Sequence, residues 1–234
     1  MSAGPTALDL LTRGGITVKG RLPWSSNATF LVELTLEQAT TSAVYKPERG
    51  ERPLWDFPPG LFKREIAAYH LSEALGWRLV PPTVECEGPL GEGSLQLFVR
   101  ADFEQHYFTL IERPELHDRL KCICAFDLLA NNADRKSGHC LLGQDGALYA
   151  IDNGLCFSAQ PKLRTVIWEF GGEPISPGIL ADVQRVVASE LAPSLGAGLE
   201  PDEREALLAR GRALVAEGRF PARTGGRDYP WPLV

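Results

Sequence analysis

Alternating apolar and polar positions mark three segments in the first fifty residues of the chain. They cover residues 15–22, 28–36 and 41–47, are rich in β-branched and aromatic residues, and are separated by the turn-forming stretches PWSSN and EQAT. Strands that bury one face against a core show this period of two, so we predict an antiparallel meander of three strands. Two further strands are predicted at residues 79–86 and 94–100, on either side of the glycine-rich stretch EGPLGEG.

A helical pattern interrupts the alternation between the third and the fourth of these strands. Phe62, Ile66 and Tyr69 recur at i, i+4 and i+7 within residues 60–77, which is the spacing of one face of an α-helix. Gly76 stands where the pattern ends and favours the left-handed conformation that closes many helices. The first hundred residues thus predict a sheet with one helix.

The second half of the chain is predicted to be mainly helical. The apolar positions of residues 112–131 follow a helical period, and they are Leu116, Leu120, Ile123, Phe126 and Ala130. A short hairpin is predicted at residues 139–142 and 148–151, around the turn GQDG. Two last helices are predicted to begin at Pro177 and Pro201, because proline is favoured at the first helical position. The predicted fold class is therefore α+β.

Composition narrows the range of partners. The chain has 234 residues, 44% of them hydrophobic, and a formal net charge of -6. Because Lys and Arg form no cluster, this charge argues against nucleic acid or anionic lipid as a partner. No stretch reaches the roughly 20 apolar residues of a membrane span, so we predict a cytoplasmic protein without a stable membrane anchor. The five cysteines form no CxxC pair, which favours reduced thiols over disulfides.

Four charged residues occur in an order that fits phosphoryl transfer, and they are Lys46, Glu65, Asp134 and Asp152. That chemistry needs a lysine at the phosphates, a carboxylate near the accepting hydroxyl and oxygen ligands for magnesium. Lys46 lies near the end of an apolar predicted strand, where an unpaired ammonium is costly to bury. Glu65 on the following helix is its candidate partner. The alternative is an ordinary edge lysine and a solvated glutamate.

The polar stretch NNADRKSGHC, residues 131–140, lies between a predicted helix and the predicted hairpin. Asn, Asp, Ser and Gly favour turns, so a solvated turn is one interpretation, and a catalytic loop built around Asp134 is the other. Because one hairpin separates Asp134 from Asp152, both carboxylates are able to face one cleft. Asp152 is then a hard oxygen ligand for magnesium, or else only a residue of the Asn-Gly turn that follows it.

Together these segments resemble a known family. The stretches DLLANNADRKSGHCLL and LYAIDNGLCF, preceded by AVYKP and LFKREIAAYHLSEALG, resemble the phosphatidylinositol 3-/4-kinase superfamily. The likeness is greatest to the type II phosphatidylinositol 4-kinases and to a bacterial branch of SCO1664 type, and it covers about residues 15–170. It implies a two-lobed, protein-kinase-like α+β fold with ATP bound between the lobes. The strand-rich N-lobe would be residues 1–99 and the mainly helical C-lobe residues 100–234.

The resemblance also implies roles for individual residues. Lys46 contacts the ATP phosphates and Glu65 anchors Lys46. Asp134 orients or deprotonates the accepting hydroxyl, with Arg135 beside it as a further catalytic residue, and Asp152 binds magnesium. The turn that covers the terminal phosphates, as a small anion nest, consists of Ser25, Ser26 and Asn27. The linker whose backbone bonds adenine consists of Leu97, Phe98 and Val99.

One position departs from the family pattern DRxxxN, in which the asparagine supplies a second magnesium ligand. His139 stands in its place, and imidazole suits manganese or zinc better than magnesium. Three outcomes stay open: an enzyme that uses one Mg²⁺, a preference for Mn²⁺, or a nucleotide binder that has lost transfer. His139 itself either faces the metal or is a structural residue that caps the strand after it.

A second departure concerns the substrate. The lipid kinases of this kind carry a palmitoylated insertion or a basic, apolar membrane-docking surface, and this sequence has neither. We predict a kinase that transfers the γ-phosphoryl group of ATP to a hydroxyl of an unidentified acceptor: a soluble small molecule, a protein Ser/Thr or an inositol lipid. The alternatives are a pseudokinase that binds nucleotide without turnover, a kinase-like enzyme that transfers AMP, and a structural domain with coincidental motifs.

Overall fold

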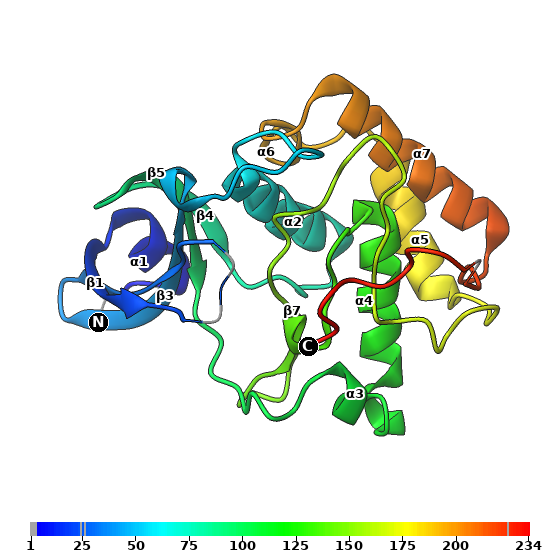
Figure 1. Ribbon diagram of the computed structural model, residues 1–234, viewed down its shortest axis with the longest axis horizontal. Coiled ribbons are helices and arrows are strands. Elements are labelled where there is room, and N and C mark those ends of the chain that lie inside the picture. The colour runs from blue at the N-terminus through cyan, green and yellow to red at the C-terminus, as the bar shows by residue number, and fades with distance from the viewer. Residues whose placement is uncertain (1–3, 24, 26, 224) are drawn as a thin grey trace.

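The computed structural model describes residues 4–23, 25, 27–223 and 225–234. Figure 1 shows strands gathered near the N-terminus and helices making up most of the remainder. The N-lobe holds a five-stranded antiparallel sheet of order β1-β2-β3-β5-β4. Its strands are β1 (Gly15–Arg21), β2 (Phe30–Leu36), β3 (Ala39–Pro47), β4 (Thr83–Gly88) and β5 (Gly91–Leu97). The predicted meander and the two later strands are confirmed.

One face of the sheet packs against a helix that the sequence pattern does not predict. This helix, α1 (Ala7–Arg13), buries Leu10 and Leu11 against residues of β2, β3 and β5. It has seven residues, too few for an apolar period to stand out. Its local signal is a capping box: the Asp9 amide donates to Thr6 Oγ1 at 3.2 Å, and the Thr6 amide donates to Asp9 Oδ2 at 2.9 Å.

The predicted N-lobe helix forms as α2 (Leu61–Leu75) and ends at Gly76, whose φ of 75° is left-handed. Phe62 and Tyr69 of the predicted apolar stripe are buried and Ile66 is half-buried. The face opposite to the stripe is buried as well, because the sheet packs on one side of α2 and the helices α5 and α6 pack on another. Glu51 caps the other end of the helix. Its carboxylate accepts hydrogen bonds from the amides of Gly60 and Phe62, each at 2.9 Å.

The C-lobe is organised around α4 (His117–Ala130), the central vertical helix of Figure 1. The other helices are α3 (Tyr107–Leu110), α5 (Pro177–Val187), α6 (Pro193–Gly196) and α7 (Pro201–Glu217), with the hairpin β6 (Cys140–Leu142) and β7 (Leu148–Ala150). The described residues also form the 3-10 turns η1 (Glu48–Gly50), η2 (Pro114–Leu116) and η3 (Ser137–His139). The predicted hairpin, α4, α5 and α7 are confirmed. The helices α3 and α6 have four residues each and are not predicted from the sequence.

All five cysteines are free, as predicted. Cys124, Cys140 and Cys156 lie in the core of the C-lobe. Burial raises the pKa of Cys140 to about 12, so this thiol stays protonated and unreactive at neutral pH. In the described part of the chain, no helix is both long and apolar enough to cross a bilayer.

The close contact between α5 and α7 gives a test of the packing. A Cβ atom at Gly211 would lie 2.4 Å from Val187 Cγ1 and 3.3 Å from Leu129 Cδ2. Because Val187 is β-branched, its methyl group cannot swing away as the end of a long side chain would. Overpacking should therefore outweigh the gain in helix propensity, and we expect Gly211→Ala to lower the free energy of unfolding by about 1–2 kcal/mol.

Urea unfolding measures this change, and Gly178→Ala is the matched control. Gly178 lies in α5, and a Cβ atom there would meet nothing within 4 Å, so alanine should not lower the stability at that position. A Gly211→Ala protein as stable as the Gly178→Ala protein would contradict the packing of the two helices.

Candidate active site

Two adjoining cavities open between the lobes and form one cleft, because four residues line both: Ser25, Thr29, Lys46 and Asp152. The first, here called the polar cavity, measures about 260 Å³ and is also lined by Asn27, Glu51, Arg52, Leu54, Glu65 and Asp134. The second, here called the apolar cavity, measures about 400 Å³ and is also lined by Val44, Leu97, Phe98, Val99, Phe103 and Leu141. Except for Arg135 and for Ser26, which lies outside the described residues, the predicted site residues from both halves of the chain thus line this cleft.

Lys46 reaches this cleft from the end of β3, where it is paired in register with Ser94 of β5. Its ammonium contacts the Glu65 carboxylate of α2 and lies 2.8 Å from Asp152 Oδ1. Burial works against the charged form of Lys46, but Asp152 and Glu65 outweigh it and raise the pKa of the lysine above its ordinary value. The pairing of Lys46 with Glu65 that the sequence order suggests is therefore present.

Two asparagines hold the loop after α4 in shape. Asn131 closes the helix in the left-handed region, with φ of 52°, and its side chain donates to the carbonyls of Ser158 and Gln160 at 2.9 and 2.7 Å. Asn132 Oδ1 accepts the amide of Asp134 at 2.9 Å. Such side-chain bonds to the backbone are typical of turns, and here they fix a loop that presents Asp134 to the cleft.

Arg135 is fully buried and does not reach the cleft. Its Nε lies 3.0 Å from Asp127 Oδ1, and its terminal nitrogens donate to the Ile151 carbonyl at 2.6 Å and to Asn153 Oδ1 at 2.7 Å. The guanidinium thus joins α4, the loop and the segment after β7. Arg135 lines neither cavity, and a side chain so enclosed holds other residues in place; its direct catalytic role stays a prediction.

Asp134 points into the polar cavity with 24% of its side chain exposed. Burial raises the pKa of its carboxyl group to about 6, although Lys136, whose ammonium lies 3.2 Å away, acts in the opposite direction. This pKa is close to the value that suits a general base at neutral pH.

Asp152 follows β7 with its backbone in the left-handed region, at φ of 57°. This conformation is uncommon for a residue with a side chain, and strained residues of this kind cluster at functional sites. Half of the side chain is exposed to the cleft. Its Oδ2 lies 3.3 Å from His139 Nε2, and Lys46 holds the pKa of Asp152 well below its ordinary value.

His139 presents no free lone pair to the cleft. The amide of Lys136 donates to its Nδ1 at 3.3 Å, so in the neutral ring the proton sits on Nε2, which faces Asp152. Burial lowers the pKa of His139 to about 4 and keeps the ring neutral. The ring lines the apolar cavity beside the Asp152 carboxylate, a position that fits the structural alternative for His139; its metal-facing role stays a prediction.

A divalent cation in this cleft would depend on Asp152. Nowhere in the described residues do three or more His, Cys, Asp or Glu side chains come together as a metal site. Magnesium, however, is commonly held by one or two carboxylates together with phosphate oxygens. The half-exposed carboxylate of Asp152 fits this mode of binding, in which the cation and a phosphate-bearing ligand bind together.

The turn expected to cover phosphates is held against the segment that follows β3. Ser25 Oγ lies 2.8 Å from Thr29 Oγ1, and Asn27 Oδ1 accepts the amide of Arg52 at 3.0 Å. Ser26, the third residue expected here, lies outside the described residues. Arg52 and Glu51 also line the polar cavity. No hydrophobic period and no motif in the sequence singles them out.

The three residues expected to bond adenine line the apolar cavity, but two of their amides already have acceptors. Leu97 and Phe98 donate to backbone carbonyls at 2.8 and 3.1 Å. Val99 is the one of the three whose amide has no backbone acceptor in the part of the chain that the structure describes. Phe103, 58% exposed, adds an aromatic ring that sequence reasoning misses.

These features define the class of protein: a two-lobed, kinase-like α+β fold with a polar cleft between its lobes. Solved structures with a similar fold include a kinase. The Golgi casein kinase with Mn/ADP bound matches with a TM-score of 0.54 and 16% identity, over 97% of this chain and 79% of that chain. The hydra Fam20 with sugar matches with a TM-score of 0.55 and 18% identity, over 90% of this chain and 86% of that chain. At these identities the likeness concerns the fold.

A sequence relative places the chain in a family. Protein Rv2133c of Mycobacterium tuberculosis (strain ATCC 25618 / H37Rv) is 39% identical over 260 aligned residues, which cover 95% of this chain and 94% of that protein. The chain belongs to the family of Protein Rv2133c. No family model matches the sequence.

The buried pair of Asp127 and Arg135 gives a second test. Both side chains are 0% exposed, so Asp127→Ala leaves a buried guanidinium without its counter-charge. We expect the free energy of unfolding to fall by about 3–5 kcal/mol, measured by urea unfolding. The control is Glu33→Ala, which breaks the exposed pair with Lys19 and should cost less than about 1 kcal/mol. Equal losses in the two variants would contradict the central position of the buried pair.

Proposed function

We propose that this protein is a kinase that transfers the γ-phosphoryl group of ATP to a hydroxyl group of an acceptor. One observation carries the proposal: Lys46, Asp134 and Asp152 line the same polar cavity. The set provides a cation for phosphates, a carboxylate for the hydroxyl and a carboxylate for a metal ion, which are the groups that phosphoryl transfer needs. The fold it shares with a kinase that has Mn/ADP bound supports this proposal.

ATP would bind along the cleft, with adenine in the apolar cavity and the phosphates in the polar cavity. Flat apolar rings favour such cavities, and a few polar groups set their orientation. The groups facing adenine would be the backbone of Leu97, Phe98 and Val99, with Val99 offering the amide, because the amides of Leu97 and Phe98 already have acceptors. Lys46, which lines both cavities, would meet the phosphates, and Glu65 would hold it there. The cover over the terminal phosphates would come from Ser25, Ser26 and Asn27.

The acceptor hydroxyl would lie against Asp134. Asp134 takes the hydroxyl proton while the oxygen attacks the γ-phosphorus; the new P–O bond forms, and the bond to the β-phosphate oxygen breaks to give ADP. Mg²⁺ or Mn²⁺, held by Asp152 and the phosphates, would neutralise part of the phosphate charge. His139 would orient Asp152, and Arg135 would fix the loop that carries Asp134.

The proposal also covers the type of kinase, the boundary between the lobes, the location in the cell and the acceptor. The quoted motifs favour a type II phosphatidylinositol 4-kinase-like member of the phosphatidylinositol 3-/4-kinases, of the bacterial SCO1664-type branch. The lobes would divide between residues 99 and 100, and the protein would act in the cytoplasm without nucleic acid. The acceptor would be a soluble small molecule, a protein Ser/Thr or an inositol lipid.

Two alanine variants separate binding from transfer. We expect ATP with Mg²⁺ or Mn²⁺ to raise the thermal midpoint of the parent protein, because ligand binding stabilises the native state. Asp152→Ala should lose this rise. Asp134→Ala should keep the rise and lose ADP formation by about 100-fold or more. The exposed Glu190 offers the control, since Glu190→Ala should match the parent in both measurements.

Equal nucleotide binding by the two aspartate variants would contradict their separate roles. A parent protein whose thermal midpoint responds to no nucleotide at millimolar concentration would overturn the proposal. Metal-dependent binding without any ADP would identify a pseudokinase, and release of pyrophosphate in place of ADP would identify AMP transfer.

The raised pKa of Asp134 predicts the pH dependence of transfer. The carboxyl group must be deprotonated to accept the hydroxyl proton, so the rate should rise with pH and level off above a pKa of about 6. Single-turnover rates from pH 4.5 to 8 with saturating ATP and metal would measure this profile. A rate that does not change across this range would contradict a general-base role for Asp134.

A further inference from the structure

The polar cavity contains two cationic side chains, and only one of them is already paired. Lys46 lies between Glu65 and Asp152. Arg52 is exposed, and no carboxylate of the described residues lies within ion-pair distance of its guanidinium. A cleft cation without a protein counter-charge is free to bind an anionic ligand.

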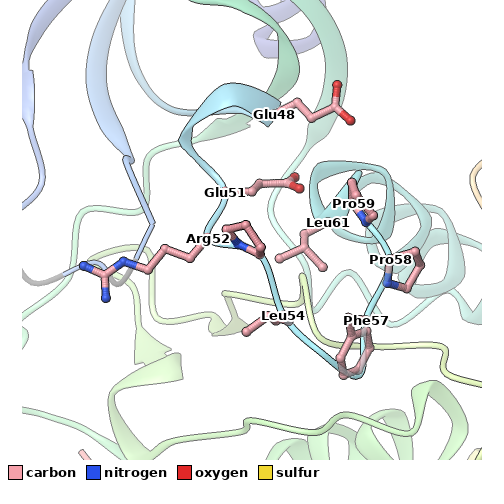
Figure 2. Close-up of a pocket in the computed structure, with 9 residues that line it drawn as sticks. Glu48, Glu51, Arg52, Leu54, Phe57, Pro58, Pro59 and Leu61 are labelled. Carbon is pink, nitrogen blue, oxygen red and sulfur yellow. The ribbon is translucent and has the colours of Figure 1, made fainter.

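Two sets of hydrogen bonds hold the segment that carries Arg52: one from the Arg52 amide and one to the side chain of the adjacent Glu51. The Arg52 amide is bonded to Asn27 Oδ1 at 3.0 Å, which ties it to the turn over the cleft. The adjacent Glu51 carboxylate is occupied by the amides at the start of α2, so it does not neutralise Arg52. Figure 2 shows Arg52 extending away from Glu51 and Leu61, to the opposite side of the segment.

The lining of the two cavities places Arg52 along the cleft. Lys46 and Asp152 line both cavities, whereas Arg52 and Asp134 line only the polar one. Arg52 therefore shares the polar end of the cleft with Asp134 and does not line the apolar cavity. In the proposed reaction this end holds the phosphoryl group in transfer, between the nucleotide and the acceptor hydroxyl.

We infer that Arg52 is a catalytic residue that binds the terminal phosphate of the nucleotide. The inference rests on the proposed kinase function. A planar guanidinium donates two parallel hydrogen bonds to phosphate oxygens, which a lysine ammonium cannot reproduce. Because charge spreads over the equatorial oxygens during transfer, the contact stabilises the transition state as well as bound ATP.

The test compares ATP with ADP, since only ATP carries the terminal phosphate. Dissociation constants for both nucleotides, with Mg²⁺, are measured by titration calorimetry for the parent and for Arg52→Ala, Arg52→Lys and Arg212→Ala. We expect Arg52→Ala to weaken ATP by about 10- to 100-fold and to leave ADP unchanged. Arg52→Lys should lie between the parent and Arg52→Ala. Arg212, exposed on α7 away from the cleft, is the control, and Arg212→Ala should match the parent.

The outcomes that overturn the inference are distinct from failure of the proposed function. ATP and ADP affinities that both stay at the parent value in Arg52→Ala, or that fall together, would exclude a contact with the terminal phosphate. A parent protein that binds neither nucleotide would instead overturn the kinase proposal itself. The thermal midpoint without nucleotide should be the same for the parent and Arg52→Ala, which shows that the side chain acts on the ligand and not on the fold.

Discussion

The rest of the site depends on one buried charge, the guanidinium of Arg135. A charge removed from water must be paired and fully hydrogen-bonded, and Arg135 meets this demand through Asp127, the Ile151 carbonyl and Asn153. These partners come from α4 and from the segment after β7. The requirement therefore fixes two otherwise separate stretches, one next to Asp134 and one around Asp152, relative to each other.

The second constraint acts across the lobes and is electrostatic. Two carboxylates, Glu65 and Asp152, share the single ammonium of Lys46, which leaves an excess of negative charge at that point. Glu65 also accepts the amide of Asn153 at 2.9 Å, so α2 is tied directly to the segment that carries Asp152. In the proposed function this arrangement would favour a further cation at Asp152, and the contacts of Glu65 and Lys46 join the two lobes at the cleft.

The sequence pattern predicts those strands and helices that are long enough to show a period of apolar residues. The strands β1 to β5, the helices α2 and α4, and the loop after α4 all follow from such patterns, and the order of Lys46, Glu65, Asp134 and Asp152 foresees that these residues line one cleft. The short helices α1, α3 and α6 have too few residues for a period. The burial of Arg135 and the open side chain of Arg52 depend on contacts far apart in the chain, which no local pattern contains.

The substitution of histidine for asparagine at position 139 connects these observations. Because the Lys136 amide occupies Nδ1, the ring offers Asp152 a donor and offers a cation no lone pair. In the proposed function the cation would therefore have one carboxylate ligand among the described residues, that of Asp152, and its remaining ligands would be phosphate oxygens and water. If one cation binds in place of two, side-chain cations would have to neutralise more of the phosphate charge. Lys46 is already shared by two carboxylates, so Arg52 is the group left to meet the charge on the terminal phosphate.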